Sequence, residues 1–239
     1  MKIVLFVYDF PHKKSLKGMQ IIKSHGFKEV FVVLSPKIEL KFRQSQTRIS
    51  VVEKEIIQPS SLAYQYGWKS LVANHNSDEA LSFYRQIKPN YGIILGARIL
   101  SKSVIDSFSE GIINFHPGVL PENRGLDNLK WAIYNKIPQG VTTHFIDENI
   151  DVGEQIYKEL LEVNNEDTIF DVNSKLLDLQ LIHLNKLISE NFNFKNTKSL
   201  KSDYKSQKAV SDKIDKKIFS LFKKYKQEYF EIQNKYKEL

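Results

Sequence analysis

Hydrophobic and polar positions along the chain form short blocks that predict strands and helices in turn. Continuous apolar runs, typical of parallel strands covered on both faces, occur at Lys2 to Tyr8, Glu29 to Leu34, Tyr91 to Leu95 and Gly111 to His116. Apolar residues at helical spacing predict helices at Ser15 to Ser24, Gln58 to Tyr66, Ser77 to Lys88, Ser101 to Phe108, Asn128 to Asn135 and Thr168 to Ser189. Other extended segments are expected at Ile49 to Val52, Val141 to Ile146 and Gln155 to Val163. This alternation predicts an α/β fold with a doubly wound, mostly parallel sheet, in which ligands lie beyond the carboxyl ends of the strands.

The last part of the chain has a different pattern and predicts a separate extension. Residues 1–190 are expected to form the main domain, the polar residues 191–206 a linker, and residues 207–239 a basic amphipathic helix. The apolar positions of this helix recur every three or four residues and are Ile214, Ile218, Leu221, Tyr225, Tyr229, Ile232 and Tyr236. We expect this face to pack on the main domain or on a second copy of the chain, which would make a homo-oligomer.

Charge and composition narrow the possible partners. The net charge is +7, and residues 195–239 carry all of the excess with 13 lysines and six acidic residues. The main domain therefore has no net field to attract a polyanion, and the tail has no arginine to grip phosphates bidentately, so nucleic acid is not the expected partner. No apolar run is long enough to cross a membrane, and the absence of cysteine fits a cytoplasmic protein.

The candidate chemistry lies between Gly111 and Gly153. Strand geometry points Asn114 and His116 to the same side, and Pro117 ends their strand. Asp151 follows a second extended run and precedes Gly153, so its carboxylate could meet the Asn/His pair. A polar pair at a strand end and a turn aspartate are the ordinary structural explanations for these residues.

Other kinds of site find little support in the sequence. His144 is expected to be a buried structural histidine. A metal site formed by His116, His144 and Asp151 is conceivable, but no local ligand spacing supports it and we predict none. The chain has no nucleophile elbow, no dinucleotide fingerprint and no Walker loop.

Several motifs in one order resemble the active-site region of the 10-formyltetrahydrofolate-dependent formyltransferases. They are Asn114-Phe115-His116-Pro117, Leu120-Pro121, Arg124-Gly125 and Asp151-Val152-Gly153, preceded by a strand and the loop Arg98-Ile99-Leu100. The resemblance covers about residues 70–160 and implies a Rossmann-like formyltransferase fold. Within this family, the chain most resembles the sugar N-formyltransferases in kind.

This resemblance implies roles for individual residues. Catalysis is expected from Asn114, His116 and Asp151, with His116 accepting a proton or stabilising the oxyanion, Asn114 donating to that oxygen and Asp151 orienting His116. The formyl donor, 10-formyltetrahydrofolate, would be held by Arg98, Ile99, Leu100, Asp147, Glu148, Asn149 and Ile150. The acceptor would contact Pro121, Asn123 and Arg124.

The expected acceptor is inferred from the positions where this sequence differs from the related formyltransferases. Glycinamide-ribonucleotide formyltransferases carry a glycine-rich loop after the first strand, whereas Asp9 to Ser15 contains no glycine here. Initiator-tRNA formyltransferases carry a separate basic domain, in contrast to this short tail. We therefore expect a small-molecule amine, most simply a nucleotide-linked amino sugar. The alternatives are glycinamide-ribonucleotide or methionyl-tRNA formylation, formyltetrahydrofolate hydrolysis, and an inactive binding or scaffold protein.

Overall fold

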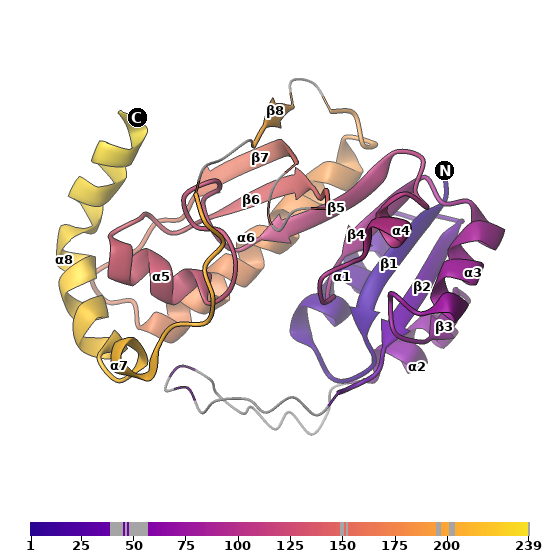
Figure 1. Cartoon of the computed structure of the whole chain (residues 1–239), viewed down its shortest axis with the longest axis horizontal. Coiled ribbons are helices and arrows are strands. Elements are labelled where there is room, and N and C mark those ends of the chain that lie inside the picture. The colour runs from indigo at the N-terminus through magenta and orange to yellow at the C-terminus, as the bar shows by residue number, and fades with distance from the viewer. Residues whose placement is uncertain are drawn as a thin grey trace.

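One eight-stranded sheet runs through the molecule, with the two termini at opposite ends (Figure 1). The computed structural model describes residues 1–38, 45, 47, 57–148, 151, 153–194, 197–200 and 204–238. The strand order is β3-β2-β1-β4-β5-β6-β7-β8. The strands are β1 (Ile3–Tyr8), β2 (Val30–Ser35), β3 (Lys69–Val72), β4 (Tyr91–Ile94), β5 (Gly111–His116), β6 (Gly140–Phe145), β7 (Glu154–Leu160) and β8 (Lys198–Ser199).

The first five strands are parallel and the last three are antiparallel. β3, β2, β1, β4 and β5 pair in parallel, with β4 joined to β5 from Tyr91↔Gly111 to Ile94↔Asn114. β6, β7 and β8 continue the sheet by antiparallel pairing. The order of the parallel strands reverses between β1 and β4, which is where doubly wound sheets open a crevice for ligands.

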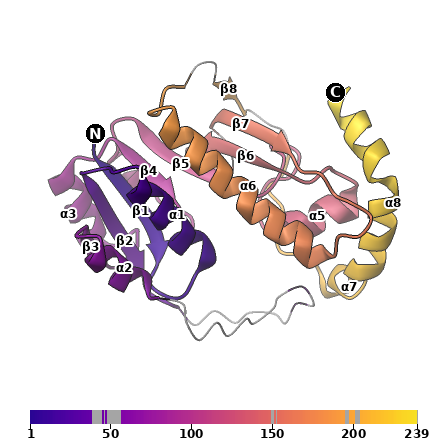
Figure 2. The ribbon, with the colours of Figure 1, turned by 180° about the vertical axis from the view of Figure 1, so that it is seen from behind.

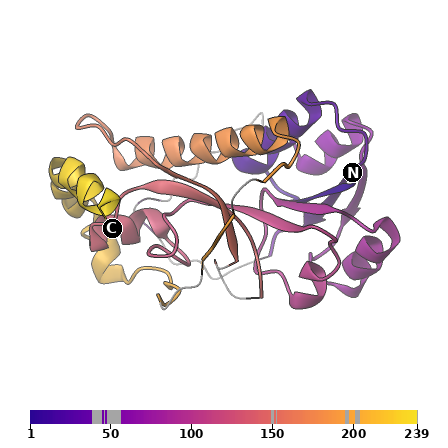
Figure 3. The same cartoon turned by 90° about the horizontal axis from the view of Figure 1, so that it is seen from above.

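Helices cover both faces of the sheet (Figures 2 and 3). One face carries α1 (Lys13–Ser24), α2 (Pro59–Gln65) and the long α6 (Ile169–Ser189), and α3 (Asp78–Ile87) and α4 (Lys102–Ile105) lie on the other. Side-chain caps begin several of them: Ser77 accepts the Ala80 N–H at α3, and Thr168 forms a capping box with Asp171 at α6. α5 (Asn128–Asn135) packs beside β6 and the tail.

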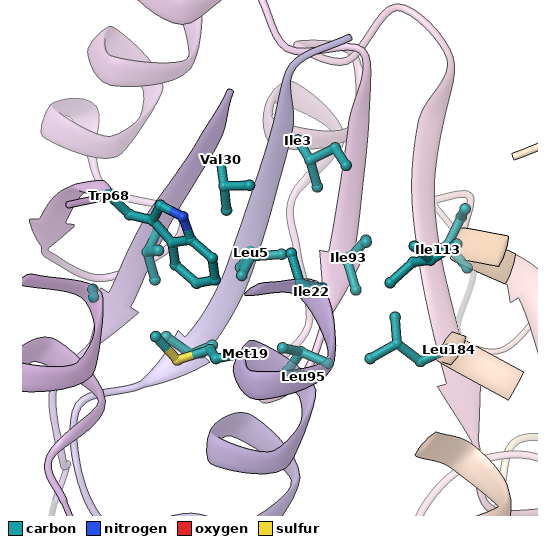
Figure 4. Packing of buried hydrophobic residues seen from close by; sticks show 14 of the residues in the cluster. Ile3, Leu5, Met19, Ile22, Val30, Trp68, Ile93, Leu95, Ile113 and Leu184 are labelled. Carbon is teal, nitrogen blue, oxygen red and sulfur yellow. The ribbon is translucent and has the colours of Figure 1, made fainter. Parts of the chain in front are cut away.

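Alternation along the strands divides the core into two layers. Ile3 and Leu5 of β1 share one cluster with Ile113 of β5 and with residues of α1 and α6 (Figure 4). Phe115 of β5 belongs to the same cluster. Val4 and Phe6, which alternate with Ile3 and Leu5 along β1, pack instead with α3 and α4. Each of these apolar side chains is fully enclosed, so burial holds the strand register and thereby the direction of every side chain at the strand ends.

The C-terminal helix packs on its own chain. α7 (Asp212–Asp215) is followed by α8 (Ile218–Lys237), whose buried residues Ile218, Phe222, Tyr225, Tyr229 and Ile232 form a third apolar cluster with α5, β6 and the first half of α6. Polar contacts join the same surfaces: Tyr229 Oη donates to the Leu161 carbonyl at 2.6 Å and accepts the Gln139 N–H at 3.0 Å. Packing on the main domain, one of the two expected arrangements, accounts for this face.

Most expected elements are present, with a few differences. The helix expected from Ser101 to Phe108 is confined to Lys102–Ile105, and the expected strand at Ile49 to Val52 lies outside the described residues. β3 was not expected, since it is a short edge strand with three of its four residues exposed. Within residues 191–206, Phe192 and Leu200 are buried and β8 pairs with β7. The division into domain, linker and extension stays a prediction.

Candidate active site

β5 carries Asn114 and His116 to the carboxyl edge of the sheet. Ile113 and Phe115 enter the layer beneath α1 and α6, so Asn114 and His116 point to the opposite face, as strand alternation predicts. Asn114 is half-buried, and in the β5–β6 register it stands opposite His144 while His116 stands opposite Thr142. Two polar side chains are thus presented at the end of a strand that the core holds rigid.

The loop after β5 folds back over His116. Thr142 of β6 fastens its start, because its hydroxyl donates to the Gly118 carbonyl at 2.8 Å and accepts the Leu120 N–H at 3.0 Å. A Cβ at Gly118 would lie 2.9 Å from His116 Nε2 and 2.8 Å from the Asn123 carbonyl oxygen. Glycine at this position therefore permits the close approach of the loop to the imidazole.

Asp151 and His116 meet although they belong to different segments. His116 Nδ1 lies 3.2 Å from Asp151 Oδ1, and the Gly125 N–H donates to Asp151 Oδ2 at 2.7 Å. Burial acts to raise the pKa of Asp151, but the charge and hydrogen bond of His116, the Gly125 amide and the charge of His144 together bring it below its usual value. Asp151 is therefore a carboxylate under ordinary conditions, suited to stabilise positive charge on the ring.

The second nitrogen of His116 also has partners. Nε2 lies 2.8 Å from the Asn123 carbonyl oxygen and 3.1 Å from Asn128 Nδ2, and Asn128 Nδ2 also donates to the Asn123 carbonyl at 3.0 Å. A ring with its proton on Nδ1 can accept from Asn128 through Nε2. A doubly protonated ring can instead donate to Asn123 and Asp151 at once. Nε2 of His116 therefore has a hydrogen-bond partner both when it carries a proton and when it does not.

Asn114 and His144 flank this pair. The Asn114 side chain makes no hydrogen bond to any other described residue, so its amide is available to a ligand. His144 is fully buried, as expected, with Nδ1 2.9 Å from the Phe145 carbonyl and Nε2 4.0 Å from Asp151 Oδ1. Nowhere in the described ranges do three or more histidine or acidic side chains come together to hold a metal ion.

The three residues expected to contact the acceptor lie in the same loop. The Leu120–Pro121 peptide bond is cis and Pro121 is half-buried. Asn123 is 1% exposed, and its side-chain amide donates to the Asn128 carbonyl at 2.9 Å. Arg124 is buried and donates through Nη1 to the Tyr204 carbonyl at 2.7 Å. The polar side chains of Asn123 and Arg124 are engaged within the protein, and direct contact with an acceptor stays a prediction.

The two segments expected to hold the donor approach each other beside this site. Leu100 belongs to the α3–α4 side of the core, and Ala97 and Ile146 pack against the same cluster. The Asn76 side chain donates to the Ile99 carbonyl and accepts the Ser101 N–H, both at 2.9 Å, while Ile99 itself is 68% exposed.

Charged residues lie at the edge of the region expected to hold the donor. Arg98 points toward β2, with Nη1 3.5 Å from Ser35 Oγ. Asp147 is half-buried and Glu148 exposed. Hydrogen bonding and charge from Asp106, and further the charge of Glu148, raise the pKa of Lys102, so Glu148 lies near the start of α4. Asn149 and Ile150 lie outside the described residues.

Three contributors to the site escaped the sequence reasoning. Asn128 reaches His116 from the first turn of α5, Thr142 holds the loop, and Gly125 supplies the amide for Asp151. The glycine of the Arg-Gly motif was noticed only as part of a pattern. Asn128 and Thr142 carry no motif, since their positions depend on strand register and on the path of the loop.

The mostly parallel α/β sheet, with a His–Asp pair and a free asparagine amide at its carboxyl edge, defines an α/β protein with an acid–base site. The chain belongs to the formyl transferase family, whose model matches residues 1–188. It is 27% identical over 212 residues to a methionyl-tRNA formyltransferase from Clostridium tetani, covering 83% of this chain and 62% of that protein. A methionyl-tRNA formyltransferase from Halothermothrix orenii is 34% identical over 122 residues, 49% of this chain and 38% of its own length. This chain thus spans less than two thirds of both relatives.

Solved structures share the fold. A 4-N formyltransferase from Francisella tularensis superposes with a TM-score of 0.61 at 22% identity, covering 90% of this chain and 86% of that one. An N-formyltransferase from Helicobacter canadensis, in complex with folinic acid and dTDP-3-aminofucose, gives 0.62 at 21% identity, with coverage of 88% and 72%. A phosphoribosylglycinamide formyltransferase from Anaplasma phagocytophilum gives 0.61 at 19% identity, with coverage of 84% and 94%. In the part of this chain that the structure describes, no helix is both long and apolar enough to span a membrane.

Proposed function

We propose that this chain is an N-formyltransferase that moves the formyl group of 10-formyltetrahydrofolate to a primary amine on a nucleotide-linked sugar. The observation that carries the proposal is the hydrogen-bonded arrangement of His116 between Asp151 and the Asn123 carbonyl, beside the unengaged amide of Asn114. Formyl transfer to an amine requires a proton acceptor and a donor to the carbonyl oxygen. This site offers both.

The work of the protein in this reaction is proton handling and charge stabilisation. His116 accepts at Nε2 the proton that the amine loses as its nitrogen bonds to the formyl carbon, and the cation is stabilised by Asp151 at Nδ1 and by the Asn123 carbonyl at Nε2. His116 then returns the proton to N10 of the folate as the bond between N10 and the formyl carbon breaks. Asn114 donates an N–H to the carbonyl oxygen as negative charge develops on it. Asp151 also fixes the ring plane, because the Gly125 amide holds its other oxygen.

The residues near the site fit a folate donor. The exposed Ile99 offers an apolar surface beside main-chain groups that Asn76 holds in place, and the turn containing Asp147 lies against the same region. A flat ring system with hydrogen-bonding edges suits an apolar surface bordered by main-chain groups. The donor supplies the formyl group on N10, and the chain supplies its orientation toward Asn114 and His116.

The choice of a sugar nucleotide rests on the region after β1. His12 caps α1, with its Nδ1 2.8 Å from Ser15 Oγ, and the segment contains no glycine to let a phosphate approach the backbone. This differs from the loop that glycinamide-ribonucleotide enzymes use for their substrate phosphate. The Helicobacter canadensis relative, solved with dTDP-3-aminofucose, shares the fold and supports a sugar acceptor. The absence of cysteine supports a cytoplasmic location.

Methionyl-tRNA is the second candidate acceptor. The curated relatives carry that activity in their names, and α8 has a lysine-rich outer surface. The apolar face of α8, however, is occupied by its own chain. The lysines alone would bind a polyanion weakly and with strong salt dependence.

An acceptor panel tests the proposal. The full chain is incubated with 10-formyltetrahydrofolate and, separately, a dTDP-linked 3-amino or 4-amino sugar, glycinamide ribonucleotide, methionyl-tRNA, or no amine. We expect formylated product only with the sugar nucleotides. Turnover with methionyl-tRNA alone would reassign the acceptor, and formate release without any amine would show a hydrolase. No reaction in any arm, with folate bound, would favour a binding protein.

A further inference from the structure

A segment of the tail runs along the active-site loop through backbone hydrogen bonds. Residues 204–210, here named the strap, cross beside residues 124–127 in Figure 1, where the orange chain descends toward α7. Gly125 and Gln207 form a parallel bridge, the Gln207 N–H donates to the Arg124 carbonyl, and the Leu126 N–H donates to the Gln207 carbonyl, both at 2.9 Å. Gln207 thus holds the residues on both sides of Gly125.

Further contacts fasten the strap at both ends. Arg124 Nη1 donates to the Tyr204 carbonyl at 2.7 Å, and Trp131 Nε1 donates to the Lys208 carbonyl at 2.7 Å. The Val210 N–H donates to Asp127 Oδ2 at 3.1 Å. Just beyond the strap, the buried Lys130 and Asp215 pair at 2.6 Å. Every one of these contacts joins the tail to the loop or to α5.

Gly125 is the point where these contacts reach the chemistry. Its N–H donates to Asp151 Oδ2 at 2.7 Å, and Asp151 Oδ1 lies 3.2 Å from His116 Nδ1. Gly125 has φ +97, and a Cβ there would lie 2.2 Å from the Gln207 carbonyl oxygen. The strap therefore passes as close to Gly125 as a glycine allows, and it limits the directions in which the Gly125 N–H can point.

We propose that Gln207 is a positioning residue of the active site, which acts through the Gly125 amide to orient Asp151 toward His116. This inference rests on the proposed role of Asp151 in formyl transfer. The tail would then be part of the catalytic apparatus as well as a packing element, since its backbone sets the geometry of a loop that would otherwise have free N–H and carbonyl groups.

Gln207→Pro tests the proposal, because proline removes the N–H that donates to Arg124. The matched control is Lys205→Pro, which places the same residue in the same strap at an exposed position whose N–H has no partner among the described residues. Trp131→Phe is a milder second variant, since it removes only the donor to the Lys208 carbonyl. It keeps the proposal testable if Gln207→Pro does not fold.

Two measurements are made on each full-length variant. Formyl transfer is followed from acid to neutral pH, and the Asp151 carboxyl group is titrated by carbon NMR while hydrogen exchange of the Gly125 amide is recorded. The groups facing Asp151 are the Gly125 amide from the loop, His116 from β5 and His144 from β6. Loosening the Gly125 amide removes one of the contacts that lower the pKa of Asp151, so the acid limb of activity should move to higher pH.

We expect Gln207→Pro to lower kcat about 10-fold to 100-fold and to speed exchange at Gly125, with a smaller change of the same kind in Trp131→Phe. Lys205→Pro should stay within about twofold of the wild type. If Gln207→Pro and Trp131→Phe fold but leave the Asp151 titration and Gly125 exchange unchanged, the proposal is overturned. The Asp151 titration and the Gly125 exchange test the role of the strap even if no amine is formylated. A failure of the proposed function would therefore be distinguished from a failure of this proposal.

Discussion

Lys14 Nζ donates to the Phe115 carbonyl at 3.1 Å, between the two polar residues of the β5 end. β4 pairs with β5 only as far as Asn114, so the lysine satisfies the next carbonyl along the strand. Burial lowers the pKa of Lys14 from 10.5 to about 7, and no described carboxylate forms an ion pair with it. Lys14 thus joins the start of α1 to β5 through one side-chain hydrogen bond.

This relationship predicts a rise in stability at alkaline pH. Between pH 7 and 10.5 the unfolded chain binds more protons at Lys14 than the folded chain, so the free energy of unfolding should increase with pH. The slope for one proton is at most about 1.4 kcal/mol per pH unit. Urea unfolding of Lys14→Met at pH 7, 8 and 9 should show this slope reduced. Lys28→Met, at an exposed position, should keep it, and equal slopes in both variants would refute the role of Lys14.

The proposed catalytic group can be examined residue by residue. His116→Ala should lower kcat by about 10²-fold to 10⁴-fold, the usual worth of general acid–base help. Asn114→Ala should lose a comparable factor, and the double variant should lose less than the product because the two act on one transition state. Asp151→Asn keeps the shape but cannot stabilise the charged ring. Folate affinity, measured by calorimetry, should be nearly unchanged, and wild-type turnover in His116→Ala would remove the mechanism.

Asn128 offers a test that the sequence did not suggest. Its amide donates to His116 Nε2 at 3.1 Å and to the Asn123 carbonyl at 3.0 Å. Asn128→Ala should therefore misalign the His116 imidazole relative to the Asn123 carbonyl. We expect a loss of about 10-fold in kcat with little change in KM. Asn135→Ala, on the exposed end of the same helix, is the control. Steady-state kinetics that found the two variants alike would show that Asn128 has no part in the reaction.

The attachment of α8 can be measured through one hydroxyl. Tyr229→Phe removes the acceptor of the Gln139 N–H and one of the two donors to the Leu161 carbonyl, which keeps its hydrogen bond from Gln233 Nε2 at 2.9 Å. The buried Gln139 N–H thereby loses its hydrogen-bond acceptor. The free energy of unfolding should fall by about 1 to 3 kcal/mol. Tyr134→Phe, half-exposed at the surface of α5, should change it by less than about 0.5 kcal/mol. Chemical denaturation that gave equal values would argue against a structural role for this hydroxyl.

Two histidines, the buried His75 and the half-buried His12, predict a loss of stability in mild acid. Burial lowers the pKa of His75 to about 4, although the hydrogen bonds that its ring donates to the Val33 and Val7 carbonyls act to raise it. Burial, together with the charge of Lys14, lowers the pKa of His12 to about 4. Between pH 6.5 and 4 the unfolded chain binds more protons, so the free energy of unfolding falls as pH falls.

The combined variant His12→Asn with His75→Gln cannot titrate and retains polar groups at both positions. Its melting temperature should therefore depend less on pH between 6.5 and 4 than that of the wild type. His25→Gln, which replaces an exposed imidazole, serves as the control. An undiminished pH dependence in the combined variant would show that other groups control acid unfolding.

Local patterns predicted much of the fold and part of the site. The run from Gly111 to His116 was delimited correctly because a continuous apolar run with a following proline has few other interpretations. The edge strand β3 was missed, since Lys69 and Ser70 give it no apolar signature. In α8 the sequence selected Leu221, whereas the structure buries Phe222 fully and Leu221 only in part, because helical periodicity leaves neighbouring positions unresolved.

The assembly of the site depended on contacts that no local pattern contains. Asp151 and His116 belong to different segments of the chain, and only the tertiary structure brings Asp151 Oδ1 to 3.2 Å from His116 Nδ1. Asn128 and Gly125 are set by the path of the loop, which the strap holds from a distant part of the chain. The resemblance of motifs supplied the participants, and the tertiary structure supplied the hydrogen bonds between them.

The backbone character of the strap has a consequence for how this protein can diverge. Mutation at Gln207 can replace the side chain freely, because the two bonds that join it to the loop come from main-chain atoms. Gly125 has no such freedom, since any other residue would meet the Gln207 carbonyl. Among descendants of this chain, the sequence of the strap can therefore change while its backbone keeps the same path. Gly125 should be conserved more strictly than any side chain of the strap.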